Sequence, residues 1–192
     1  RRQRQMCIRD RIKWATEVAA DFHARFDAKA RTYIYILRNH PVASALLNGL
    51  VGWFHLPLDL KQMQAAATYL VGTHDFSSFR SSECQAHSPI RTIYDLSIRQ
   101  QGNLFIFTVR GDGFLHHMVR NIVGSLVYVG KGKYQPEYMA EILAHRARKY
   151  AAPTFMADGL YLAHIAYPNH SGINHLLPEL TLAESLNHLL NA

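Results

Sequence analysis

The sequence contains few cysteines and no long hydrophobic run. Cys7 and Cys84 are the only two cysteines in 192 residues, they lie far apart in the sequence, and neither belongs to a Cys-x-x-Cys pair, so the pattern indicates neither disulfides nor a zinc site. No apolar stretch approaches the roughly 18 residues that a membrane span needs, and residue 1 is not followed by a secretory-leader pattern. We therefore expect a cytoplasmic protein in a reducing compartment.

The charge is unevenly distributed along the chain. The net charge is +7, and a content of 48% hydrophobic and 18% charged residues is typical of one globular domain, or of one domain with part of another. Residues 1–11 hold much of the excess, with five arginines and one aspartate. This string resembles the translation of a sequencing-library adaptor, so we expect a scar and a natural protein cut at its start. The alternative is a basic arm that binds nucleic acid.

Hydrophobic periodicity predicts four strands and three helices between residues 12 and 168. Residues 12–28 are interpreted as a strand remnant of a preceding domain and a linker, and residues 41–55 as irregular or briefly helical. The clearest helix begins at Asp59, where Gln62 completes a capping box. The predicted strands are 31–37, 92–100, 104–109 and 160–167, and the predicted helices are 59–71, 116–129 and 136–149.

These elements predict an α+β fold in residues 29–168. We expect an antiparallel sheet of about four strands with helices packed on one face and the other face open for a ligand. The basic residues at 145–149 are interpreted as a solvated face that complements the helix dipole, and the alternative is that they contact a nucleic acid. In the tail, residues 169–192, Thr181 and Glu184 make a second capping box, which predicts a short helix.

The segment from Gly111 to Gly124 predicts a strand, a Gly-Asp-Gly turn and a helix. Met118 and Ile122 belong to a buried stripe, whereas Arg120 and Gly124 lie on another face. Gly124 leaves room for a close approach of backbone or substrate one turn beyond the arginine, at a cost of ~1 kcal/mol in helix propensity.

Histidine is abundant, with 12 residues, but its pattern predicts no metal site. His116 and His117 are the one adjacent pair, and a metal-dependent hydrolase built on them would need carboxylate ligands, for which only Asp112 lies nearby. We keep this as a minor alternative and predict no metal.

Five motifs give the chain a resemblance to a known family. They are Phe-His-Ala-Arg-Phe at 22–26, Ala-Arg-Thr-Tyr-Ile-Tyr at 30–35, Asp-Phe-Ser-Ser-Phe-Arg at 75–80, Phe-Leu-His-His-Met-Val-Arg-Asn-Ile-Val-Gly at 114–124 and Gly-Leu-Tyr-Leu at 159–162. In this order they resemble the signatures of the bacterial tRNA pseudouridine synthase A family. The resemblance implies a homodimeric enzyme without cofactor or metal that isomerises uridine in the tRNA anticodon stem-loop, at positions 38 to 40.

The resemblance also implies roles for individual residues. Arg120 matches the arginine that pairs with the catalytic carboxylate, and Tyr33 matches the tyrosine that packs against the target base. For RNA binding we expect basic, aromatic and polar side chains near these two, namely Arg25, Lys29, Arg31, Phe79, Arg80, His116, His117 and Asn121.

The chain departs from the family in one respect that bears on activity. The family's nucleophilic aspartate lies in a Gly-Arg-Thr-Asp-Ala-Gly-Val-His-Ala motif, and no such string occurs in this sequence. We therefore expect the chain alone to be inactive. The alternative function is that of a non-catalytic RNA-binding α+β module.

Overall fold

A mixed sheet of six strands forms the centre of the fold. In the computed structural model, which describes residues 15–168, the sheet order is β2-β1-β5-β4-β3, and β6 also pairs with β1. The strands are β1 (Ala30–Asn39), β2 (Gly52–Phe54), β3 (Gly72–Asp75), β4 (Ile90–Gln101), β5 (Leu104–Gly111) and β6 (Leu160–Ala166). The expected antiparallel sheet of about four strands therefore needs correction, because two short strands extend it and β2 runs parallel to β1.

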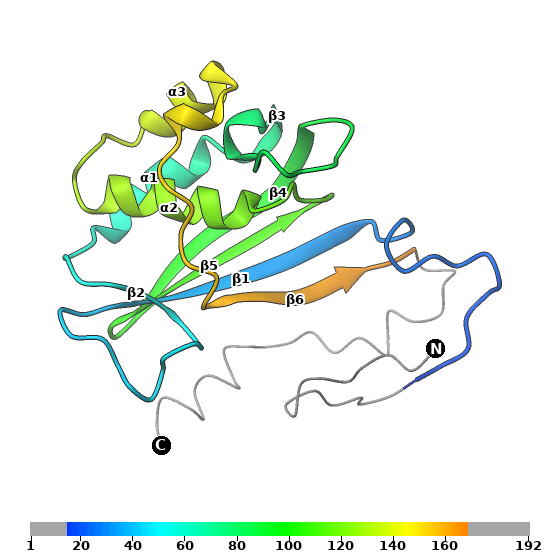
Figure 1. Ribbon diagram of the computed structural model, residues 1–192, viewed down its shortest axis with the longest axis horizontal. Helices are drawn as coiled ribbons and strands as arrows, with labels where there is room; N and C mark the ends of the chain where they lie inside the picture. Colours follow the sequence, from blue (N-terminus) through cyan, green and yellow to red (C-terminus); the bar gives the residue numbers. More distant parts are fainter. Residues whose placement is uncertain (1–14, 169–192) are drawn as a thin grey trace.

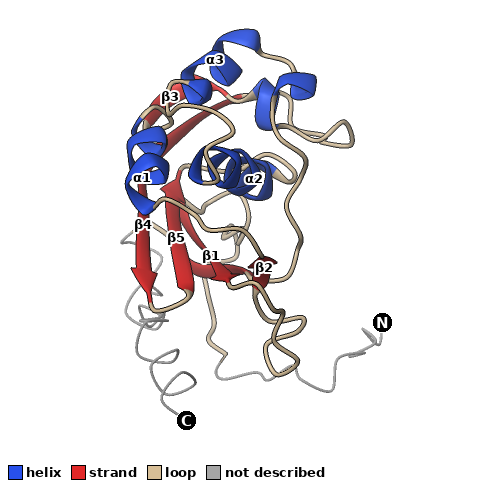
Figure 2. Ribbon diagram, turned by 90° about the vertical axis from the view of Figure 1, so that its left-hand side faces the viewer, coloured by secondary structure: helices blue, strands red, loops and turns tan. Residues whose placement is uncertain are grey.

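Three α-helices and two short 3-10 turns accompany the sheet. They are α1 (Leu60–Thr68), the turn η1 (Ser77–Phe79), α2 (Met118–Gly130), α3 (Tyr138–His145) and the turn η2 (Arg148–Tyr150). The helices lie together on one side of the sheet (Figures 1 and 2), which confirms the predicted α+β layering. None of the helices in residues 15–168 is long and apolar enough to cross a membrane.

The main core lies between the sheet and α2. Tyr35 and Leu37 on β1, Phe107 on β5 and Met118 and Ile122 on α2 are fully buried there. The alternate β1 residues Ile34 and Ile36 belong to a second buried cluster on the opposite face of the sheet, as the strand period of two requires. Side chains of β1 are therefore packed on both faces of the sheet.

The two predicted strands at 92–100 and 104–109 form the antiparallel hairpin of β4 and β5, but the side chain of Tyr94 departs from strict alternation. Strict alternation places Tyr94 on the same face as Leu96 and Ile98. The pairing register of β4 against β5 shifts between Ile93 and Asp95, so Tyr94 is an extra bulged residue. Ile93 is therefore buried, whereas Tyr94 is 46% exposed.

The segment before β1 also differs from the prediction. Residues 15–29 form turns and extended coil, so the expected strand remnant is wrong for the residues of that segment that the structure describes. A strand there would need a neighbour with free backbone groups, and β1 already pairs with β2, β5 and β6. Residues 1–14, which include the predicted scar, and the tail at 169–192 with its predicted helix lie outside the described residues.

The first long helix begins where the sequence indicates. Asp59 accepts a hydrogen bond from the backbone N–H of Gln62 at 3.1 Å, as an N-cap should. The α-helix ends earlier than predicted, at Thr68, because the N–H groups of Tyr69, Leu70 and Val71 donate to carbonyls three residues back, as in a tighter last turn. The chain then turns at Gly72 (φ +109°) to begin β3.

Candidate functional site

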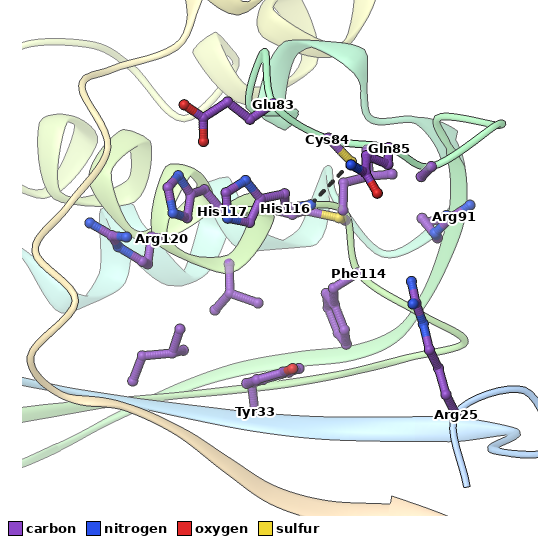
Figure 3. Close-up of a pocket in the computed structure, with 15 residues that line it drawn as sticks. Arg25, Tyr33, Glu83, Cys84, Gln85, Arg91, Phe114, His116, His117 and Arg120 are labelled. Atoms are coloured by element: carbon purple, nitrogen blue, oxygen red, sulfur yellow. Dashed lines mark hydrogen bonds between the residues drawn. The ribbon is translucent and has the colours of Figure 1, made fainter. Parts of the chain in front are cut away.

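A pocket of about 570 Å³ lies beside the junction between β5 and α2. We call it the junction pocket. It is lined by Arg25, Tyr33, Glu83, Cys84, Gln85, Ala86, Arg91, Phe114, Leu115, His116, His117, Met118, Val119, Arg120 and Leu160. Figure 3 shows Arg25 and Arg120 at opposite ends of this pocket, with the two histidines and Phe114 between them. One lining residue, Tyr33, packs against the main core, so the pocket lies on the side of the sheet that carries the helices. The face that was expected to be open is the opposite one.

Local hydrogen bonds hold the turn that leads into the pocket. The Asp112 backbone N–H donates to the Thr92 carbonyl at 3.1 Å, and the Asp112 side chain accepts from the Thr92 N–H at 3.0 Å. The Arg31 guanidinium donates to the Asp112 carbonyl at 2.8 Å. A Cβ at Gly111 would lie 2.7 Å from the Thr92 carbonyl, so only glycine allows this approach. The chain therefore leaves β5 in one defined direction.

Arg120 is half-buried in the first turn of α2 and is held by its own backbone partners. Its Nε donates to the Phe155 carbonyl at 2.7 Å, and the Phe155 N–H donates to the Arg120 carbonyl at 3.3 Å. The only ion pair among residues 15–168 is that of Arg146 with Asp75 at 3.7 Å, so no described carboxylate compensates Arg120. A cation at a helix N-terminus opposes the helix dipole by ~0.3–1 kcal/mol. The site therefore favours an anionic partner.

Gly124 allows the segment that holds Arg120 to approach the helix. A Cβ on this residue would overlap the carbonyl oxygen of Pro153, two residues before Phe155. The predicted close approach one turn beyond Arg120 is confirmed, and the partner is backbone.

Two aromatic rings form an edge-to-face pair in the pocket. The centroids of Tyr33 and Phe114 are 5.2 Å apart at an interplanar angle of 84°. Tyr33 remains half-buried, so part of the side chain is accessible from the pocket. An accessible aromatic side chain can stack on an unpaired base.

Two histidines form a stacked pair over the helix start. The ring centroids of His116 and His117 are 3.9 Å apart, and His117 adopts the left-handed conformation (φ 61°). Burial, then the neighbouring charges of His116 and Arg120, lower the pKa of His117. His117 is therefore neutral at pH 7 and able to accept a hydrogen bond.

The thiol of Cys84 lies against the same junction. Burial is the largest influence on its pKa and raises it, but hydrogen bonds from the N–H groups of His116 (3.3 Å) and Ala86 and the charge of Arg80 bring the pKa below its usual value. No group of three or more histidine, cysteine or acidic side chains within residues 15–168 could hold a metal ion.

The structure brings five of the ten predicted site residues into the junction pocket. These are Tyr33, Arg120, Arg25, His116 and His117. Their positions do not test their predicted roles in catalysis and RNA binding. The structure does place Arg25 and Arg120, which are 95 positions apart in the sequence, in the lining of one pocket.

The other five predicted residues lie outside the pocket lining. Lys29 is exposed before β1, and Arg31 braces the Asp112 turn. Phe79 and Asn121 are fully buried, and the Asn121 amide donates to the Phe79 carbonyl at 2.7 Å. Arg80 donates to the carbonyls of Cys84 and Ala86 in the loop that lines the pocket. Their part in RNA binding stays a prediction, and the structure places Phe79 and Asn121 behind the pocket wall.

Several lining residues have no signal in the sequence pattern. Glu83, Cys84 and Gln85 come from the loop before β4, and Arg91 and Leu160 come from the starts of β4 and β6. None belongs to a motif that indicates a site by spacing, except Leu160 in the Gly-Leu-Tyr-Leu string. Leu160 is brought to the pocket by the pairing of β6 with β1. The loop before β4 is held there because Arg80 donates to the Cys84 and Ala86 carbonyls and the His116 N–H donates to the Cys84 thiol.

The fold and the pocket define an α+β protein with a basic, aromatic-lined binding site at a strand-to-helix junction. The sequence profile described as tRNA pseudouridine synthase matches residues 66–168, more than half of the chain. The chain therefore belongs to the tRNA pseudouridine synthase family.

Curated relatives agree with this assignment. The chain is 52% identical over 162 residues to tRNA pseudouridine synthase A of Paraburkholderia xenovorans, which covers 84% of this chain and 60% of that protein. It is 56% identical over 160 residues to tRNA pseudouridine synthase A of Herminiimonas arsenicoxydans, which covers 81% of this chain and 58% of that protein. The chain thus spans about 60% of the length of these relatives.

Proposed function

We propose that this chain carries the arginine and tyrosine of a pseudouridine synthase active site that acts on the tRNA anticodon stem-loop at positions 38 to 40. One observation supports this most directly: Arg120 is oriented by Phe155 in the pocket that contains Tyr33, and it has no carboxylate partner among residues 15–168. An arginine in this position would keep an incoming aspartate ionised, because an opposite charge lowers a carboxyl pKa.

The reaction class suits the groups in the pocket. Isomerisation of uridine replaces the C1′–N1 bond by a C1′–C5 bond, and the proton lost from C5 is balanced by one gained at N1. The base must leave its stack to react, and the accessible Tyr33 side chain can receive it. No oxidant, metal or cofactor is required for this balance.

We propose that the nucleophilic aspartate is not among these 192 residues. The Gly-Arg-Thr-Asp-Ala-Gly-Val-His-Ala string is absent from the sequence. Within this proposal the chain contains a short remnant of a first domain at 12–28 and the second α+β domain at 29–168. The complete protein would be a cytoplasmic homodimer.

The first test uses the chain alone with a tRNA that lacks modification. We expect no pseudouridine, measured by release of tritium from 5-tritiated uridine. Measurable turnover would contradict the proposal that the nucleophile is missing.

The second test uses the complete reading frame. Arg120→Ala should abolish turnover, by a factor of roughly 10² or more, while tRNA binding weakens much less. Arg99→Ala, an exposed arginine on β4, is the matched control and should retain activity. Equal losses of binding and turnover in Arg120→Ala would show that Arg120 is a phosphate contact instead.

A second candidate function is a non-catalytic RNA-binding module. Two observations favour this candidate. The sequence has no aspartate motif, and the lining of the junction pocket contains three arginines and one glutamate. The two candidates differ in one measurement, which is turnover by the protein encoded by the complete reading frame. Activity there supports the synthase, and RNA binding without activity supports the module.

A further inference from the structure

A second pocket, of about 410 Å³, lies beside the turns η1 and η2. It is lined by Ser77, Arg80, Ser81, Ser82, Arg148 and Thr154. We call it the serine–arginine pocket. Its six lining side chains are two guanidinium groups and four hydroxyl groups, without a carboxylate or an apolar side chain. Such a lining offers hydrogen-bond donors and positive charge to an anion.

Both guanidinium groups are fixed before any ligand binds. Arg80 donates through Nη2 to the carbonyls of Cys84 (2.6 Å) and Ala86 (2.9 Å). Arg148 donates to the carbonyl of Ala151 at 3.1 Å, to the Asn121 amide oxygen at 3.2 Å and to the Thr154 hydroxyl at 3.1 Å. Because the two side chains are already ordered, binding an anion costs little further conformational entropy.

The positive charge of the serine–arginine pocket is not neutralised by a described carboxylate in its lining. Two acidic residues lie close in sequence to the lining. Glu83, next to Ser82, lines the junction pocket instead. Asp75 is engaged elsewhere: one oxygen accepts from the Ser77 N–H (2.9 Å) and hydroxyl (2.6 Å), and the other lies 3.7 Å from Arg146. Ser77 is therefore committed to Asp75. Within residues 15–168, no acidic side chain forms an ion pair with Arg80 or Arg148.

The serine–arginine pocket is connected to the junction pocket through residues that are neighbours in the chain. Ser82 is followed directly by Glu83, the first residue of the loop that lines the junction pocket, and the Ser81 N–H donates to the His116 carbonyl at 3.1 Å. On the other side, Thr154 precedes Phe155, whose carbonyl holds Arg120. A polymer with one unit in the junction pocket would thus pass close to the serine–arginine pocket.

We propose that the serine–arginine pocket binds a backbone phosphate of the RNA whose target base enters the junction pocket. Arg80 and Arg148 supply the charge, and the hydroxyl groups of Ser81 and Ser82 donate to the phosphate oxygens. This inference rests on the proposed function, because that function supplies the RNA. A phosphate contact of this kind sets the register of the strand without reading its sequence.

The test places a negative charge in the pocket without removing any of its hydrogen-bonded arginines. Ser82→Asp is compared with the neutral Ser82→Asn, and with Asn103→Asp at the far turn of the β4–β5 hairpin, which changes the net charge equally. The readout is the affinity of the full chain for an anticodon stem-loop RNA, measured by fluorescence anisotropy at several salt concentrations.

Ser82→Asp should bind the RNA roughly 5- to 10-fold more weakly, and the slope of log K against log salt should fall by about one. Ser82→Asn and Asn103→Asp should bind within about twofold of the unchanged chain, since neither puts charge in the pocket. Equal affinities of Ser82→Asp and Ser82→Asn would overturn the proposal.

Inorganic phosphate is the second probe, followed through the backbone amide signals of Ser81 and Thr154 by NMR. Saturable shifts that disappear in Ser82→Asp support a phosphate site. If these phosphate-induced shifts disappear in Ser82→Asp but the RNA affinity of Ser82→Asp equals that of the unchanged chain, the pocket binds free phosphate and the RNA assignment is overturned.

The outcomes also separate this inference from the proposed function. If the complete protein has no synthase activity but Ser82→Asp still weakens RNA binding, the phosphate site stands and the synthase proposal fails. If Arg120-dependent turnover is found and Ser82→Asp binds RNA normally, the phosphate site alone fails.

Discussion

Replacing Gly124 by alanine tests how the orientation of Arg120 is maintained. A Cβ at this position would lie closer to the Pro153 carbonyl oxygen than the 3.0 Å that real Cβ contacts keep, and that oxygen belongs to backbone. The segment 153–155 must therefore move, and with it the Phe155 carbonyl that accepts the Arg120 hydrogen bond. Overpacking costs about 1–3 kcal/mol, and the better helix propensity of alanine offsets ~1 kcal/mol.

We expect the free energy of unfolding of Gly124→Ala to fall by about 1 kcal/mol, and by at most about 2 kcal/mol, which for a chain of this size lowers Tm by roughly 2–8 °C. Gly113→Ala is the matched control, because the nearest atom to a Cβ there is 3.6 Å away, an ordinary contact. The assay is thermal unfolding of both variants followed by circular dichroism. If Gly124→Ala is as stable as the control or more stable, helix propensity outweighs the clash and the reasoning is wrong.

Three further predictions concern the core, the bulge and the pH dependence. Asn121→Ala should lower the free energy of unfolding by about 2–3 kcal/mol in urea titrations, because it leaves buried partners such as the Phe79 carbonyl unsatisfied; a loss below about 1 kcal/mol would contradict this. Leu96→Ala should lower the free energy of unfolding by about 2–3 kcal/mol and Tyr94→Ala by less than about 1 kcal/mol, since the bulge exposes the tyrosine. A larger loss in Tyr94→Ala than in Leu96→Ala would contradict the bulge. His117 should titrate below 6.5 by NMR, because partial burial and the neighbouring cations lower its pKa. Protonation therefore opposes folding, so the contribution of His117 to stability is lost as the pH falls below the unfolded-state pKa toward the lowered folded-state pKa, and a pKa above 6.5 would contradict this setting.

Local signals were sufficient for the elements that are long and strongly patterned. The stripe of Met118, Ile122, Leu126 and Val129 predicted α2, and all four residues are buried. The N-cap at Asp59 and the hairpin turn at Gly102 were also predictable, because each depends on neighbours only a few residues away.

Short strands and inward-turned polar groups were not predictable in the same way. The strands β2 and β3 have three and four residues, too few for a period to be recognised, and they form because β1 and β4 present free edges. Arg148 was interpreted as part of a solvated basic face, but its guanidinium is directed to Asn121 and Thr154. Burial lowers its pKa, which reflects this inward position.

By itself, the sequence determined the α+β class, the junction between β5 and α2, and the motifs through which Arg120 and Tyr33 suggest a family, because these depend on local propensity and on ordered strings. Only the tertiary structure decided which side of the sheet holds the junction pocket, and that Arg80 and Arg148 share a second pocket beside it. The physical reason is that these residues are 68 positions apart, and their proximity arises from the packing of η1 against η2 and α3, which no local pattern encodes.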